Sequence, residues 1–538
     1  MNLAHKILWN TISQVAGKFI VTLLGLVNIK LLTNYLGVAG YGEYATIYQF
    51  LAFFGIAADL GLFTIAVREM SRDENKIPII AGNVLGLRTA LITITMTLAI
   101  IAAFLIPQYQ HTRIPLGVAM ASFTVWAAMV QGTLCTVLQV KLKMEYSSIA
   151  LIVFKSIAVL YMIIVIYFLL PLNNAQICTT NDEVGTACPA ITQNNIVAAS
   201  SAQSASDAGF YHMIFAGNIA SIVFIVMTYY FTRKLAPIKY RFDFHLWKEI
   251  FWKSLPYGAA LILNSFYFKI DSLLIYFFRG STETGIYNVP MKIFEQITLI
   301  PLYFMNAVLP VLTKEIDRGK EAYNKIIQYA YDFIIMVSFP ILAGVFVLAY
   351  PLIFVVSGPE FLSRLPEGFY GADMALKILI IAFTFSFIAV VFSFILIAVG
   401  KQTRLLLVNA IAVIFNVIAN LIVIPKYGFV GAAYISVITQ FIVLFSMILY
   451  ARANLQFSLK FANTIKIACS SLIMSAAVYY LYPLLYKFMQ NWAVLVLIGF
   501  AVILYFGLLI ITKTITRDML NLLRKKETAQ AGDGSGMI

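Results

Sequence analysis

The sequence predicts an all-α polytopic membrane protein, because it is long, strongly apolar and poor in charge. Of its 538 residues, 61% are hydrophobic and only 12% are charged, whereas soluble globular proteins carry about 25% charged residues. The net charge of +14 does not indicate a nucleic-acid partner, since the basic residues lie in short gaps between apolar runs. No nucleotide, zinc or nucleophile motif is found. We therefore expect no catalytic residue, no cofactor and no metal.

Apolar segments long enough to cross a bilayer recur along the whole chain. A spanning helix needs about 20 predominantly apolar residues, and fourteen segments meet this requirement. The predicted spans are 9–33, 41–67, 82–106, 114–140, 147–170, 210–232, 254–278, 284–312, 326–351, 374–399, 405–424, 429–451, 463–486 and 492–512. Proline lies in several of them, which membrane helices tolerate where neighbouring groups satisfy the freed backbone.

The basic residues orient these spans. Cytoplasmic segments of membrane proteins are enriched in Lys and Arg. If the N-terminus is cytoplasmic, segments on that side hold 25 basic residues, opposite segments hold five, and eight lie within spans. The asymmetry predicts a multi-pass protein of the cell membrane with both termini in the cytoplasm. It also supports the number of spans, because removing one would scramble the alternation that follows.

The two longest connections have different characters. Residues 171–209 contain no Lys or Arg, which suits an exterior loop, where Cys178 and Cys188 either form a small disulfide or remain free thiols. On the other side, segment 234–253 contains the helical apolar pattern of Trp247 and Ile250 with charged residues opposite. This pattern predicts an amphipathic helix in the cytoplasmic interface.

A short repeat predicts that this linker joins two similar halves. The stretch LGVAGYGEY after the first span matches RGSTETGIY after the seventh. The matched pairs are Gly37 and Gly280, Gly42 and Gly285, and Tyr44 and Tyr287, each 243 residues apart. Internal repeats of this kind are common in transporters. The expected organisation is an N-lobe at 1–233, the linker at 234–253, a C-lobe at 254–452, an appended helix pair at 453–512 and a basic tail at 513–538.

Four stretches carry a family resemblance. They read YLGVAGYGEYATIYQF, DLGLFTIAVREMSRD, RFDFHLWKEIFWKSLPYG and YGFVGAAYISVITQF. Over about residues 5–515, the chain resembles the oligosaccharide flippase, or polysaccharide transporter, family of the multidrug/oligosaccharidyl-lipid/polysaccharide (MOP) exporter superfamily. The resemblance implies two pseudo-symmetric six-helix bundles with an alternating-access cavity and a lipid-linked oligosaccharide as substrate. Expected partners are the bilayer, polysaccharide polymerases and glycosyltransferases; the sugar stays open.

Charges within the spans point to the site. Span one carries a polar stripe that recurs every three or four residues and therefore shares one helix face. Its members are Asn10, Gln14, Lys18, Thr22, Gly25 and Asn28. The stripe suits the wall of a water-filled cavity. The alternative is polar contact between helices, with Lys18 snorkelling to the inner surface.

Other intramembrane charges extend this hypothesis. Arg88 and Lys155 fall in the inner halves of spans three and five, where they either join Lys18 in a basic patch or snorkel. Lys269 is a candidate cation of the second lobe, since Asp271, two residues away, points elsewhere on a helix.

Acidic residues within the spans are candidates for a different role. Asp271, Glu295 and Asp332 are candidate proton or sodium sites. Lys292 lies three residues before Glu295, and a structural ion pair is the favoured interpretation there.

Unpaired Lys and Arg in a site of low dielectric constant bind phosphate strongly. Together with the resemblance, this predicts a flippase that binds polyprenyl-pyrophosphate-linked oligosaccharide in the inner leaflet and releases it in the outer leaflet. The predicted substrate-binding residues are Lys18, Arg88, Lys155, Lys269, Asn10, Gln14 and Asn28.

Three alternatives remain open. A lipid II flippase for peptidoglycan synthesis would use the same chemistry. A cation-coupled multidrug antiporter should have an acidic cavity, whereas cations outnumber acids eight to five within these spans. A membrane-embedded glycosyltransferase or ligase would need paired carboxylates at a loop–membrane border, and no such motif stands out.

Overall fold

The computed structural model describes residues 3–141, 143–170 and 193–514, and its description of side chains excludes residues 3–16, 72, 74, 193–205, 256–268, 299 and 307. Within the described residues the elements are helices, and the one β-type contact is an isolated bridge between Arg364 and Phe369. The predicted all-α class is therefore confirmed. The chain divides into two compact units, Met1–Ser265 and Phe266–Ile538, and each is described by itself.

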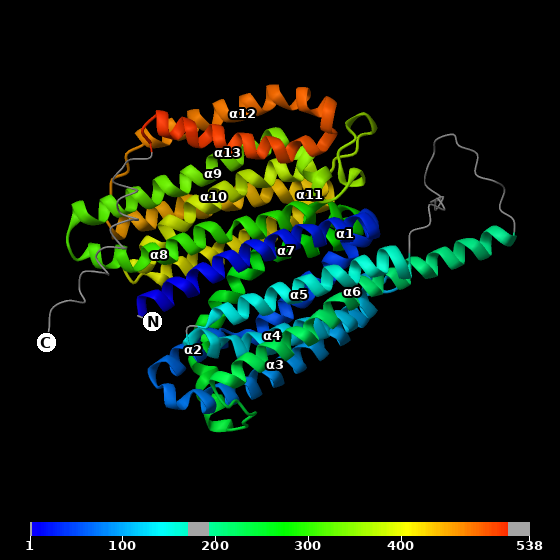
Figure 1. The fold of residues 1–538 in the computed structure, drawn as a ribbon, viewed down its shortest axis with the longest axis horizontal. Coiled ribbons are helices and arrows are strands. Elements are labelled where there is room, and N and C mark those ends of the chain that lie inside the picture. The colour runs from blue at the N-terminus through cyan, green and yellow to red at the C-terminus, as the bar shows by residue number, and fades with distance from the viewer. Residues whose placement is uncertain (1–2, 142, 171–192, 515–538) are drawn as a thin grey trace. The chain divides into compact units, whose positions relative to one another are not determined.

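The first unit is a helical bundle (Figure 1). Its elements are α1 (Leu3–Asp59), α2 (Leu62–Arg72), α3 (Ile77–Leu105), α4 (Ile114–Val140), α5 (Met144–Ile164), α6 (Gln193–Leu235) and the first part of α7 (Phe244–Ile297). Helix α4 packs against α3 and α6, while α5 packs against α1 and α6. Small residues make these contacts close: a Cβ added to Gly17 of α1 would lie 2.7 Å from Ser148 Cβ of α5.

The second unit is also a bundle, with a helix pair packed on one side (Figure 1). It contains the rest of α7, α8 (Leu299–Ile316), α9 (Lys320–Val356), α10 (Ala372–Ala398), α11 (Gln402–Asn454), α12 (Ala462–Met489) and α13 (Ala493–Ile511). Helix α10 packs against α9 and α11, and α12 packs against α9 and α13. Buried Met474, Leu497 and Tyr505 join α12 and α13 to the apolar core of the unit. The C-terminal pair therefore shares this core.

Three of the longest helices are each broken at a glycine. Gly37 in α1 has φ 65° and ψ −174°, and Gly280 in α7 has φ 83° and ψ −172°. Gly428 in α11 has φ 56° and ψ −146°. These conformations are open essentially to glycine alone. The first matched pair of the sequence repeat therefore shares its backbone conformation, and both glycines lie at predicted exterior turns.

Ten helical segments of the described chain are long and apolar enough to cross a membrane. Four of them are 48 to 55 residues long, namely Gly17–Ser71, Lys269–Ile316, Gln402–Asn454 and Ala462–Ile511, and one crossing needs only about 20. Large apolar side chains such as Ile503 (76% exposed) cover their outer faces, as lipid contact requires. The protein is a multi-pass membrane protein, and fourteen crossings stay a prediction.

The break at Gly280 gives a stability prediction. A Cβ added there meets nothing within 4 Å, so Gly280→Ala should destabilise only through backbone strain, by about 1–3 kcal/mol. The thermal unfolding midpoint of the purified protein in detergent measures this change. Gly499→Ala in α13 is the control, because its Cβ also meets nothing within 4 Å and its helical backbone suits alanine. Equal midpoints for the two variants would contradict the prediction.

Candidate functional site

Buried Arg88 forms an ion pair with half-buried Asp59 in the first unit. Its side chain on α3 is 4% exposed. One terminal nitrogen donates to the Asp59 carboxylate at the end of α1, and the other donates to Thr133 Oγ1 on α4 at 3.3 Å. These contacts join three helices at the point where α1 ends. The guanidinium predicted as a cytoplasm-accessible cation is thus neutralised by an acid of its own unit.

Lys18 and Lys155 have different surroundings from Arg88. Both are half-buried, on α1 and α5, which pack together. Lys155 Nζ lies 5.7 Å from the centroid of the Phe154 ring. No acidic side chain among the described residues pairs with Lys18. The structure therefore leaves Lys18 as a cation of the membrane region without a neutralising acid among those residues.

The remaining members of the α1 stripe are only partly described. Asn28 is half-buried, and its Oδ1 atom is buried without a hydrogen-bond partner. A Cβ added to Gly25 would meet nothing within 4 Å, so the stripe borders open space at this point. The Asn10 and Gln14 side chains and Cys178 and Cys188 lie outside the described residues. Their predicted roles stay predictions.

In the second unit, the predicted cation Lys269 and the predicted acid Glu295 lie near each other. Lys292 Nζ donates to Glu295 Oε2 at 2.9 Å, which is the ion pair favoured from the sequence. Half-buried Lys269 lies within electrostatic range of both groups. Glu295 is therefore held among lysines.

Asp332 joins the appended helix pair to α9. It is 4% exposed and accepts hydrogen bonds from Gln328 Nε2 and Asn463 Nδ2, each at 2.8 Å. Asn463 belongs to α12, so the carboxylate connects the two elements. Gln328 extends the connection to the backbone of Lys460. These contacts give Asp332 a structural role, because they hold α12 against α9.

Asp271 on α7 has surroundings that differ from those of every other acid above. Its side chain is 3% exposed. It accepts hydrogen bonds from Asn420 Nδ2 at 2.8 Å, Ser436 Oγ at 2.8 Å and Tyr287 Oη at 3.1 Å. No lysine or arginine of the described chain forms an ion pair with it. An amide and two hydroxyl groups thus stabilise this carboxylate without a cation.

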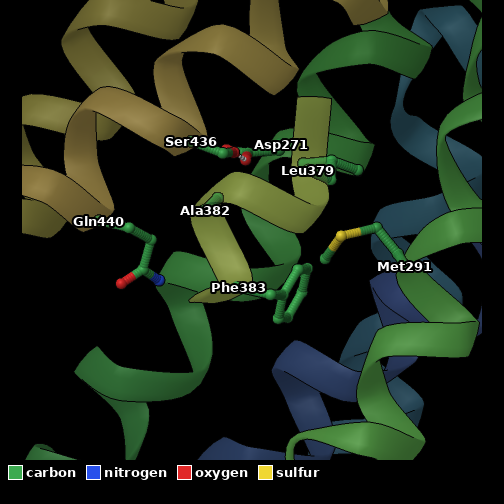
Figure 2. A pocket seen from close by; sticks show the side chains of 7 residues that line it. All are labelled: Asp271, Met291, Leu379, Ala382, Phe383, Ser436 and Gln440. Carbon is green, nitrogen blue, oxygen red and sulfur yellow. Dashed lines mark hydrogen bonds between the residues drawn. The ribbon is translucent and has the colours of Figure 1, made fainter. Parts of the chain in front are cut away.

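A small pocket adjoins this carboxylate. Its lining residues are Asp271, Met291, Leu379, Ala382, Phe383, Ser436 and Gln440. Figure 2 shows Asp271 and Ser436 meeting at one end, with the Phe383 ring and the Met291 thioether across from them. The pocket has about 20 Å³ available to the centre of a water-sized sphere, which is room for about one water molecule or small ion.

An acceptor without a donor also belongs to this cluster. The Oδ1 atom of Asn420 is buried and has no hydrogen-bond partner, while its Nδ2 group donates to Asp271. A carboxylate, a hydroxyl and an amide oxygen are ligands that hard cations prefer. The cluster can therefore hold a small cation or a proton.

Sequence reasoning identified Asp271 but missed the residues around it. Asn416 and Asn420 lie four positions apart in an otherwise apolar segment, and Ser436, Thr439 and Gln440 form a similar polar face after the Gly428 break. This repeated polarity is a signal within one helix. It does not reveal which helix the polar face meets, because that depends on packing.

Two family models, each described as a polysaccharide biosynthesis protein, match the chain over residues 7–178 and 190–366. The fold is similar to that of the lipid II flippase MurJ in an inward closed conformation, with a TM-score of 0.66 and 14% identity over 95% of this chain and 100% of that chain. The chain thus matches two polysaccharide biosynthesis family models and has the fold of this flippase.

Two MOP superfamily transporters also have a similar fold. An inward-facing multidrug resistance MATE family transporter has a TM-score of 0.60 at 15% identity, covering 82% of this chain and 97% of that one. A MOP superfamily transporter from Pyrococcus furiosus has a TM-score of 0.53 at 15% identity, covering 83% and 95%. No curated protein matches the chain. At these identities the likeness to solved structures establishes the fold alone.

The ion pair between buried Arg88 and half-buried Asp59 makes a stability prediction. Asp59→Asn leaves Arg88 charged and buried without a carboxylate, so we expect a loss of about 3–5 kcal/mol. The double variant Arg88→Met with Asp59→Leu removes both charges and should recover most of that loss, because apolar replacement of a buried pair is often neutral. Thermal unfolding midpoints in detergent test both. A double variant as unstable as Asp59→Asn would contradict this account.

Proposed function

We propose that this protein is a flippase that moves an oligosaccharide on a polyprenyl pyrophosphate carrier from the inner to the outer leaflet of the cell membrane. Alternating access would carry it across, for the synthesis of a surface polysaccharide or glycan. The observation that carries the proposal is Lys18, a half-buried lysine that no acid among the described residues neutralises. The polysaccharide biosynthesis family models and the fold of the lipid II flippase support transport of a lipid-linked sugar.

The chemistry of the carrier fits these residues. The diphosphate that links the sugar to the lipid is a compact dianion, and a partly desolvated ammonium group binds it through charge-assisted hydrogen bonds. Lys18 would be its first contact, and Lys155 on the adjoining α5 a second. Arg88 is engaged with Asp59, and its Nε atom is buried without a hydrogen-bond partner. We therefore place Arg88 behind the two lysines, with Asn28 available to accept a hydrogen bond from a sugar hydroxyl.

The test of the anion site is Lys18→Gln. Loss of one charge-assisted contact should lower transport about 10- to 100-fold, since hydrogen bonds to charged groups contribute about 1.5–3 kcal/mol. Surface glycan is measured in cells in which the native gene for this protein is deleted and replaced by the gene for the variant. The amount of the variant in the membrane is measured in parallel. Lys30→Gln is the matched control, a half-buried lysine of the same helix that lies off the polar stripe. Normal glycan with Lys18→Gln would remove this residue from the mechanism.

A lipid II flippase is the second candidate function. The similarity to MurJ extends over 95% of this chain and 100% of that one, and lipid II also carries a polyprenyl pyrophosphate. The family models favour polysaccharide synthesis instead. Rescue of a strain depleted of its lipid II flippase by this gene would reassign the substrate, whereas lost surface polysaccharide after gene deletion would support our first proposal.

We also propose that an ion gradient drives transport and that Asp271 binds the coupling ion. Three observations support it: the carboxylate is buried without an ion-pair partner among the described residues, a pocket of about 20 Å³ adjoins it, and Asn420 Oδ1 lies close by without a donor. A bound sodium ion or proton would neutralise Asp271. Its release would leave a buried negative charge, which could favour a different arrangement of the surrounding helices.

Ion binding can be measured without knowing the sugar. A ligand that binds only the folded state raises the free energy of unfolding, by about 2.7 kcal/mol at 100 times its Kd, and so raises the unfolding midpoint. We expect sodium chloride, compared with choline chloride, to stabilise the wild type but not Asp271→Asn. Asp332→Asn is the control, because that acid already has two amide donors, and it should keep the sodium response. If the unfolding midpoints of wild type and Asp271→Asn respond equally to sodium and equally to a change of pH, Asp271 is not the coupling group.

A further inference from the structure

Segment 236–253, between α6 and the membrane part of α7, is docked along one side of the first unit. The Arg241 N–H donates to the Gly82 carbonyl oxygen of α3 at 3.2 Å. A Cβ added to Gly82 would lie 2.3 Å from the Lys239 carbonyl oxygen, and one added to Gly86 would lie 2.6 Å from that of Arg241. The two glycines therefore let the segment lie directly on α3, where larger side chains would lift it away.

The first turns of α7, which complete this segment, are anchored in the same manner. Asp243 N–H donates to Asn83 Oδ1 at 2.9 Å, and the Asp243 carboxylate accepts two backbone N–H groups from the first helical turn at 3.0 and 3.3 Å. Ile250 is 3% exposed, and Trp247 and Phe251 pack against the same apolar cluster of α2, α3 and α4. One face of the N-terminal part of α7 is thus fixed on the protein.

The same segment exposes large aromatic side chains. The exposed fractions are 49% for Tyr240, 63% for Phe242, 74% for Phe244 and 61% for Trp252. The rings of Tyr240 and Phe242 stack with centroids 6.3 Å apart, and Phe244 contacts Trp247 at 5.2 Å. Aromatic side chains concentrate at the level of lipid headgroups in membrane proteins.

Basic side chains surround these aromatics in the sequence. Arg233, Lys234, Lys239, Arg241 and Lys248 are exposed, and none has an acidic partner among the described residues. Lys253 differs, because it donates to Glu249 at 2.7 Å and lies 3.8 Å from Glu69. Basic clusters next to a membrane helix, with apolar residues on one face, bind anionic membrane surfaces.

We propose that segment 233–253 binds the phosphodiester headgroups of anionic phospholipids in the leaflet on the predicted cytoplasmic side. The aromatic side chains lie at headgroup level, while the five unpaired basic residues contact the phosphates. Docking on α3 holds this surface in place before lipid arrives, so little ordering cost remains. The inference does not depend on the transported substrate or on Asp271.

Native mass spectrometry with phosphatidylglycerol tests the charges. The variant Lys239→Gln, Arg241→Gln and Lys248→Gln should bind this lipid about tenfold or more weakly than wild type at low ionic strength. The matched control is Lys314→Gln, Lys320→Gln and Lys325→Gln, which removes three exposed basic residues from the connection around α8 and α9. The control should keep wild-type affinity. Equal losses in both triple variants, or no loss in the first, would overturn the proposal.

A second measurement uses the unaltered protein, so it does not depend on the folding of a variant. Hydrogen exchange of peptides covering 237–253 should slow in nanodiscs containing phosphatidylglycerol compared with phosphatidylcholine alone, while peptides covering 314–325 should not change. Added inorganic phosphate should not displace the lipid; displacement would assign the site to a free anion instead. Unchanged exchange in both lipids would show that this segment has no preference for anionic lipid and would overturn the inference.

Discussion

The hydrocarbon layer contains no water to solvate a charge, and this constraint governs the polar chemistry of the chain. Each ionisable side chain inside the layer needs a partner from the protein or a cavity. Three carboxylates, those of buried Asp271 and Asp332 and of half-buried Asp59, meet the requirement differently. Asp59 pairs with a guanidinium, and Asp332 accepts hydrogen bonds from two side-chain amides. Asp271 accepts hydrogen bonds from one side-chain amide and two hydroxyl groups. The type of partner therefore separates structural acids from the candidate ion site.

The contacts of Asp59 and Asp332 have a common consequence. Each joins helices that are distant in the chain, and each uses partners that hold a negative charge permanently. A neutral side chain at either position would accept these hydrogen bonds more weakly, so loss of the charge would be unfavourable at both acids. Asp271 differs because hydroxyl groups can turn their hydrogen atoms and either donate or accept. Ser436 and Tyr287 can thus adapt to a neutral or cation-bound carboxylate, which suits a group whose charge changes during a cycle.

Most of the fold could be predicted from the sequence, and the site could be predicted only in part. Apolar runs and basic loops identify spans because the bilayer imposes both. The glycine repeat located two helix breaks, since only glycine suits the conformations of Gly37 and Gly280. The partners of the charges were not accessible in this way. Arg88 and Asp59 are 29 residues apart, whereas Asn420 and Ser436 are 149 and 165 residues from Asp271. Such pairings depend on how helices pack, which a single sequence does not contain.

The repeat gives these charges a further meaning. With its offset of 243 residues, Asp271 of the second unit corresponds to Asn28 of the first, and Lys18 corresponds to Leu261. One helix position therefore carries an acid in one unit and a neutral amide in the other, and the lysine has no counterpart. A carboxylate at position 28 would share the α1 stripe with Lys18, about 15 Å away along the helix, and would weaken the attraction of that stripe for a pyrophosphate. Placing the acid in the second unit and the lysine in the first keeps the two charges in separate bundles, so that each could bind its own ion while both bundles retain a common backbone plan.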